Sequence, residues 1–213
     1  MKVADFSENN KNQQVITGEN IEKFLKDIGD EMSNEEKNNL KNSSIEILKN
    51  CVPSKQNSFE SEQNTGLVLG YVQSGKTLSF TTLSTLAIDN GFRAIIYLAG
   101  TKNNLLEQTT NRLKDDLLTG SLNRRKYKVY QNPEIKDNSI NAIHNTLKRK
   151  SRPAILITIL KKEKYINELK RLFSSHEITS ELGNNGILII DDEADQASLN
   201  TFARSNSRSE DWE

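Results

Sequence analysis

The residues Gly70–Thr77 (GYVQSGKT) have types and a spacing that suit phosphate binding. They match the pattern G-x-x-x-x-G-K-[ST] in full, between an apolar run at 65–72 and a helical pattern at 77–89. Backbone N–H groups of such a loop and the positive end of the helix dipole favour phosphate oxygens. In this interpretation the Lys76 ammonium contacts the β- and γ-phosphates, and the Thr77 hydroxyl ligates Mg²⁺. The pattern predicts a nucleotide site whose cofactor-binding residues are Gly70, Gln73, Ser74, Gly75, Lys76 and Thr77. The alternative is an ordinary glycine-containing turn before a helix.

A second group of candidate residues follows an aliphatic run that ends at Ile190. An open α/β sheet binds its ligand at the carboxyl ends of the strands, where Asp191, Asp192 and Glu193 would lie. Hydrolysis of a nucleoside triphosphate needs one carboxylate to hold Mg²⁺ and another to orient or deprotonate the attacking water. Asp192 suits the first role and Glu193 the second, which makes Lys76, Asp192 and Glu193 the catalytic candidates. Asp191 replaces Asp192 as the metal ligand if the strand ends one residue earlier. A solvated acidic turn is the alternative.

The elements that would position these groups are visible from residue 65 onward. We expect strands at 66–72, 92–99, 126–131, 154–160 and 186–191, and helices over 75–89, 102–117, 138–149 and 162–174. Near-continuous Ile, Leu and Val runs separated by helices predict an α/β fold with a parallel sheet covered by helices on both faces. Right-handed crossovers then bring the carboxyl ends of the strands and the glycine-rich loop to one rim.

The first part of the chain is more polar and has a different pattern. Apolar residues at positions 21, 24, 25 and 28 predict an amphipathic helix over 18–29, and Ser33 suits the N-cap of a second helix through about Asn50. We interpret 1–62 as a small helical segment with a linker, 63–201 as the α/β lobe, and 202–213 as a polar tail.

Composition limits the function classes. The 213 residues include 29 basic and 29 acidic side chains, so nucleic-acid binding would need a local patch rather than an overall positive charge. One cysteine excludes an internal disulfide and a cysteine-rich zinc site, and it fits a reducing compartment. No apolar run reaches the length of a membrane span. We therefore expect a cytoplasmic protein without a membrane partner.

In their extended forms, VQSGKT and DDEADQASLNT, the two motifs resemble the Z1 domain family. That family consists of prokaryotic helicase-like ATPases, and the shorter motifs resemble motifs I and II of superfamily 2 helicases. The similarity covers about residues 65–201, the first RecA-like lobe. It implies a RecA-like P-loop fold, ATP and Mg²⁺ as cofactors, and DNA rather than RNA as the nucleic-acid partner. It also implies an association with endonuclease, restriction or phage-defence systems.

The resemblance extends to weaker signals. Residues 97–108 are similar to motif Ia, and residues 156–162 are similar to a later strand-end motif of the same lobe. It therefore suggests nucleic-acid contacts for Thr101, Lys102, Asn103 and Thr158, with Lys161 and Lys162 as further phosphate donors. For the first group the alternative is a helix capped by Thr101 or Asn103. The resemblance also suggests that Asp195, Ser198 and Asn200 couple the nucleotide to the nucleic acid.

Helicase-like ATPases bind ATP between two RecA-like lobes, and the second lobe supplies arginines to the transition state. No second run of alternating strands and helices follows residue 201. We therefore expect a lobe that binds Mg-ATP, hydrolyses it poorly, and needs a second lobe in cis or trans. Two alternatives stay open. One is a P-loop kinase or GTPase of another class, although the sequence has no N-K-x-D guanine motif. The other is a non-catalytic interaction module.

Overall fold

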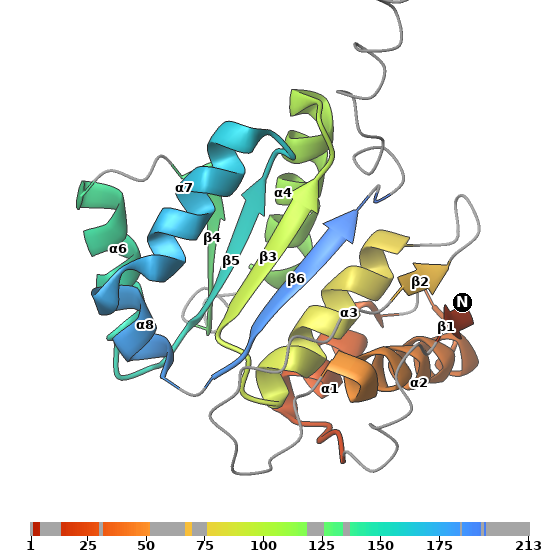
Figure 1. The fold of residues 1–213 in the computed structure, drawn as a ribbon. Coiled ribbons are helices and arrows are strands. Elements are labelled where there is room, and N and C mark those ends of the chain that lie inside the picture. Colours follow the sequence, from red (N-terminus) through yellow and green to blue (C-terminus); the bar gives the residue numbers. More distant parts are fainter. Residues whose placement is uncertain are drawn as a thin grey trace, which may run out of the picture.

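The computed structural model describes residues 2–4, 14–29, 32–51, 67–69, 76–118, 126–133, 137–183, 185–192 and 194. Its main sheet has four parallel strands in the order β4-β5-β3-β6, and their carboxyl ends meet at one rim (Figure 1). These strands are β3 (Ala94–Ala99), β4 (Tyr127–Gln131), β5 (Ala154–Ile159) and β6 (Ile187–Asp192). The prediction of an α/β fold with a parallel sheet is confirmed.

The described part of the chain contains seven helices, and they cover both faces of the sheet. They are α1 (Glu19–Asp27), α2 (Asn34–Cys51), α3 (Lys76–Asp89), α4 (Asn103–Leu117), α6 (Asp137–Leu147), α7 (Glu163–Ser174) and α8 (His176–Leu182). Figure 1 shows α7 on one side of the sheet and α4 on the other. The short helix α8 was not predicted, because only Ile178 and Leu182 of its seven residues are buried. No described helix combines the length and the apolar character needed to cross a membrane.

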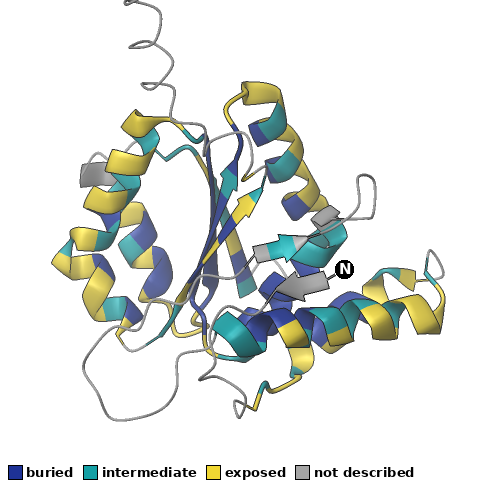
Figure 2. Cartoon of the chain, turned by 45° about the vertical axis from the view of Figure 1, so that its right-hand side comes forward, coloured by how far each residue is buried: buried dark blue, intermediate teal, exposed yellow. Residues whose placement is uncertain are grey.

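Each face of the sheet has its own apolar core, because successive side chains of a strand point to opposite faces. Ile95 and Tyr97 of β3 belong to the cluster formed with α1–α4, whereas Ala94 and Ile96 belong to the cluster formed with α6–α8. Buried residues accordingly line the strands and the inner sides of the helices (Figure 2). The N-terminal helices contribute to the first cluster through Ile21, Phe24, Leu25, Ile47 and Leu48. These helices therefore share a core with the α/β part of the chain.

The strand before the glycine-rich loop differs from the prediction. β2 (Leu67–Leu69) pairs antiparallel with β1 (Lys2–Ala4), in a two-stranded sheet separate from the four parallel strands. The expectation that this run joins the parallel sheet was wrong for the described residues 67–69. An apolar run predicts a strand but does not name its partner, and the pattern gave no sign of β1.

Helix α2 begins as the sequence predicted. The Glu36 N–H donates to Ser33 Oγ over 3.3 Å, and the Ser33 N–H donates to Glu36 Oε2 over 2.8 Å. This reciprocal capping box satisfies two donors at the helix start. The backbone hydrogen bond from Ser33, followed by the one from its hydroxyl, lowers the pKa of Glu36.

Helix α1 is capped by a residue from another helix. Its N-cap, Gly18, has no side chain to accept a hydrogen bond, and the Asp89 carboxylate at the end of α3 takes that role. Asp89 accepts hydrogen bonds from the N–H groups of Gly18, Asn20 and Ile21 over 3.0–3.1 Å. A Cβ atom on Gly18 would lie 2.6 Å from Asp89 Oδ1, so the close approach requires glycine. Asp89 thus fixes α1 to α3 through the free donors of the α1 terminus.

Candidate functional site

The start of α3 lies at the rim where the parallel strands end. Helix α3 has 14 residues and is about 21 Å long. A tight turn connects it to β3, in which the Phe92 N–H donates to the Ala87 carbonyl over 3.0 Å. The six residues of β3 return about 20 Å in the opposite direction. Lys76 and Thr77, the first two residues of α3, are therefore level with the carboxyl end of β3.

Buried hydroxyl groups fix α3 against the sheet. The Ser84 hydroxyl is hydrogen-bonded to the Tyr97 hydroxyl of β3, and Thr81 Oγ1 donates to Asp116 Oδ2 of α4 over 2.9 Å. The side chains of Thr81, Ser84 and Tyr97 are buried. Burial raises the pKa of Tyr97 above its ordinary value, so its hydroxyl stays protonated as a hydrogen-bond partner. Contacts of Thr81 and Ser84, in the middle of α3, therefore hold the helix against α4 and β3.

Asp191 and Asp192 end the neighbouring strand β6 and lie on opposite faces of the sheet. Leu188 and Ile190 belong to the cluster that contains α3. Side chains two residues apart on a strand point to the same face, so Asp192 is on that face as well. Asp191 alternates with Ile187 and Ile189, which are 40% and 57% exposed on the opposite face. The structure thus distinguishes the two aspartates, which sequence reasoning left as alternatives. Asp192 is the one on the face covered by α3.

Asp191 has a basic partner on its own face of the sheet. Lys161, which follows β5, forms an ion pair with Asp191, and the two side chains are 5% and 41% exposed. The sequence suggested Lys161 as a phosphate donor, but its ammonium is buried against Asp191. Its neighbour Lys162 is exposed at the N-cap of α7. The sequence contained no signal for the Lys161–Asp191 pair, because the residues are thirty positions apart and on strands that do not pair with each other.

Several predicted site residues lie outside the described part of the chain. These are the loop residues Gly70, Gln73, Ser74 and Gly75, the carboxylate residue Glu193, and the coupling candidates Asp195, Ser198 and Asn200. Their roles stay predictions. Within the described residues, the fold brings the first residues of α3 and the last residue of β6 to the same rim and the same face.

The motif Ia-like candidates are at the rim and exposed. Gly100 follows β3 with a φ of +73°, and the exposed residues Thr101, Lys102 and Asn103 lead from it into α4. Lys102 occupies the N-cap position, and its side chain makes no capping hydrogen bond. The alternative in which Thr101 or Asn103 is the cap residue is therefore wrong. The exposed start of α4 retains N–H groups that can bind an anion.

Thr158 does not fit the predicted contact with a nucleic acid. Its side chain is fully buried within β5, and its hydroxyl is hydrogen-bonded to Thr110 Oγ1 of α4 over 2.7 Å. The prediction failed because a threonine in an apolar strand has the same sequence pattern whether it is at the strand end or inside it. Thr158 has a structural role: it joins the sheet to α4.

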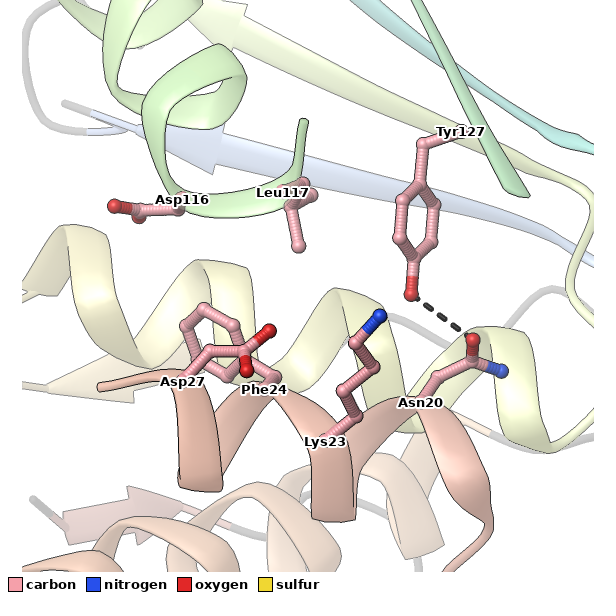
Figure 3. A pocket seen from close by; sticks show the side chains of 7 residues that line it. All are labelled: Asn20, Lys23, Phe24, Asp27, Asp116, Leu117 and Tyr127. Atoms are coloured by element: carbon pink, nitrogen blue, oxygen red, sulfur yellow. Dashed lines mark hydrogen bonds between the residues drawn. The ribbon is translucent and has the colours of Figure 1, made fainter. Parts of the chain in front are cut away.

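The pocket drawn in Figure 3 lies away from this rim. It is lined by Asn20, Lys23, Phe24, Asp27, Asp116, Leu117 and Tyr127. Tyr127 begins β4 and Leu117 ends α4, which places the pocket near the amino ends of the strands. The Tyr127 hydroxyl donates to Asn20 Oδ1 over 3.0 Å, and burial is the main cause that raises the pKa of Tyr127. This pocket is part of the α1–α4 packing.

Comparison of the chain with protein-family models, curated proteins and solved structures gave no match. Among the described residues, no three His, Cys, Asp or Glu side chains are grouped as a metal site. The candidate site therefore rests on the rim geometry and the two sequence motifs.

Proposed function

We propose that this chain is the ATP-binding, RecA-like P-loop lobe of a helicase-like ATPase of the Z1 type that acts on DNA. One observation carries the proposal: the start of α3 and Asp192 lie at the same rim and on the same face of the sheet. A phosphate-binding helix terminus and a carboxylate for Mg²⁺ need this arrangement.

The residues present suit ATP and Mg²⁺. Magnesium bound with a nucleotide keeps several waters and needs only one or two protein carboxylates besides the phosphates. Asp192 supplies one carboxylate on the α3 face, while Asp191 is engaged by Lys161 on the other face. Bound Mg-ATP would supply the phosphoryl group for transfer and neutralise its charge. Lys76 and Thr77 would bind the phosphates and the ion, and Glu193 would accept the proton of the attacking water.

The exposed start of α4 supports the nucleic-acid part of the proposal. Thr101, Lys102 and Asn103 offer side-chain and backbone donors to a DNA phosphate. In this proposal Asp195, Ser198 and Asn200 link that contact to the nucleotide. A second RecA-like lobe, in cis or trans, completes the site, and a nuclease of a cytoplasmic defence system is the expected downstream partner.

Calorimetric titration of the chain with ATP in the presence of Mg²⁺ tests nucleotide binding. We expect the parent to bind, and we expect Lys76→Ala to weaken binding by about 10- to 100-fold because a charged phosphate contact is lost. Lys148→Ala is the matched control, since Lys148 is exposed after α6, at the amino end of β5. A parent that does not bind ATP, or a Lys76→Ala variant that binds like the parent, would overturn the proposal.

Hydrolysis separates a DNA-directed ATPase from other P-loop enzymes. With the second lobe present, we expect DNA to stimulate ATP hydrolysis. Glu193→Gln should retain ATP binding and stop turnover, because only the proton acceptor is removed. Turnover that does not respond to DNA would favour a kinase or GTPase of another class.

A further inference from the structure

The ion pair between Lys161 and Asp191 joins two strands that do not touch through their backbones. β3 lies between β5 and β6, and Leu98 of β3 is opposite Ile159 on one side and Asp191 on the other. Since neighbouring strands are about 4.8 Å apart, β5 and β6 are separated by about 10 Å. The long Lys161 side chain spans that separation on the α6–α8 face of the sheet.

Lys161 is itself held firmly at the rim. Its backbone N–H donates to the Gly100 carbonyl over 2.7 Å, which extends the pairing of β5 with β3 beyond the last strand residue. The preceding residue, Leu160, is buried, and its N–H donates to Asn132 Oδ1 over 3.0 Å. The backbone at Lys161 is therefore fixed by hydrogen bonds to the residues that follow β3 and β4.

Burial of the Lys161 side chain determines the kind of partner that its ammonium requires. The Lys161 side chain is only 5% exposed, and a buried ammonium requires an anionic or strongly polar partner. Removing the Asp191 carboxylate is costly because the Lys161 ammonium stays desolvated, whereas Asp191 is 41% exposed and remains in contact with solvent when Lys161 is removed. The pair therefore holds the Asp191 carboxylate on the α6–α8 face, and the strand alternation keeps Asp192 on the α3 face.

We infer that Lys161 is a positioning residue of the proposed nucleotide site: by binding Asp191 on the α6–α8 face, it orients the end of β6 so that Asp192 alone serves the metal. This inference rests on the proposed function. It assigns to Asp191 a supporting role in place of direct metal ligation.

The inference predicts an effect on magnesium that is separate from nucleotide binding. Affinity for a fluorescent ATP analogue is measured with and without Mg²⁺ for the parent and for Lys161→Met, Lys161→Arg and Asp191→Asn. Because residues that orient a metal ligand typically affect metal affinity by 10- to 100-fold, we expect Lys161→Met to weaken the Mg²⁺-dependent binding about tenfold. Binding without Mg²⁺ should stay within about twofold, and Lys161→Arg should restore most of the loss.

Two further variants make the test specific. Lys170→Met removes an exposed lysine of α7 and should bind like the parent in both conditions. The double variant Lys161→Met/Asp191→Asn should show less loss than the sum of the two single variants, since the two side chains share a contact. Asp191→Asn keeps the shape of its side chain and provides the same test if Lys161→Met fails to fold.

The outcomes separate this inference from the proposed function. If Lys161→Met and Asp191→Asn leave the Mg²⁺ effect unchanged while Lys76→Ala weakens binding, the positioning role is wrong and the nucleotide site stands. Equal losses with and without Mg²⁺ would indicate a general structural role and would also overturn the inference. A parent that binds no nucleotide in either condition would overturn both.

Discussion

Asp191 and Asp192 are adjacent in the sequence, yet they lie on opposite faces of the sheet and have different surroundings. Asp192 is on the face that α1–α4 cover, level with the start of α3. Asp191 is on the face of α6–α8 and is paired with Lys161. The comparison shows that the surroundings of an acidic residue at a strand end depend on the face to which its side chain points. The motif alone contains both aspartates and cannot make this distinction.

A second contrast between the two faces is found at the connection between α3 and β3. Two residues there, four positions apart in the sequence, attach helices to opposite faces of the sheet. Asp89 caps α1 on one face. Arg93 donates to the Leu147 and Glu181 carbonyls, near the ends of α6 and α8, on the other. Each face is therefore tied to the α3–β3 connection by one charged side chain. The following variants test the two faces separately.

The largest effect is expected for Arg93→Ala on the α6–α8 face. Arg93 is 7% exposed, and its guanidinium donates to Leu147 over 2.6 Å and to Glu181 over 2.9 Å. The variant leaves both carbonyls without this donor, so we expect a loss of about 3 kcal/mol in the free energy of unfolding. Urea denaturation measures it, with the exposed Arg171→Ala on α7 as control. Equal stabilities of the two variants would contradict the role of Arg93.

On the α1–α4 face, Asp89→Ala should cost about 2 kcal/mol, because charged hydrogen bonds to the α1 terminus are lost. Hydrogen exchange should increase first in α1, whose terminal N–H groups lose their acceptor. The exposed Asp115→Ala on α4 is the control and should change neither quantity. Exchange that rises in α6–α8 instead would break the separation between the faces.

A smaller effect is expected where α3 contacts β3. Ser84→Ala leaves the buried Tyr97 hydroxyl without its partner and should cost about 1–2 kcal/mol. Tyr97→Phe removes the other member of the pair. The double variant should be less destabilised than the sum of the single variants, because no orphaned hydroxyl remains. Thermal unfolding of the three variants measures this coupling, and strict additivity would argue against it.

The smallest effect concerns the α2 cap, which is remote from both faces of the rim. The pKa of Glu36 is lowered in the folded state, so its stabilising contribution is present above its ordinary pKa of 4.5 and is lost as the pH falls through the folded value. Glu36→Gln should therefore differ from the parent in melting temperature at pH 7 and converge with it in acid, once the pH is below the lowered pKa of Glu36. A difference that grows in acid would have the wrong sign.

Three strands of the main sheet, β3, β5 and β6, could be predicted because each contains a continuous apolar run between helical patterns. β3, β5 and β6 were expected within two residues of their observed bounds. The N-cap at Ser33 was also predicted, because a cap residue is local in the sequence, and the structure adds Glu36 as its reciprocal partner. These features depend on nearest neighbours and periodicity, which a single sequence records directly.

The features that could not be predicted depend on contacts between distant segments. The apolar run at 67–69 gave no information on its pairing with Lys2–Ala4. Thr158 was expected to contact nucleic acid. Its hydrogen-bond partner, Thr110, is forty-eight positions away in the sequence, so the buried contact could not be predicted. The pairing of Lys161 with Asp191 arises only when β3 brings the ends of β5 and β6 to one rim.

The most direct test of the proposed site compares the parent with Asp192→Asn in calorimetric titrations with ATP, with and without Mg²⁺. We predict that Mg²⁺ strengthens ATP binding to the parent but not to Asp192→Asn, while the two proteins bind ATP alone with the same affinity. An equal effect of Mg²⁺ on both proteins would contradict the assignment of Asp192 as the metal ligand at the start of α3.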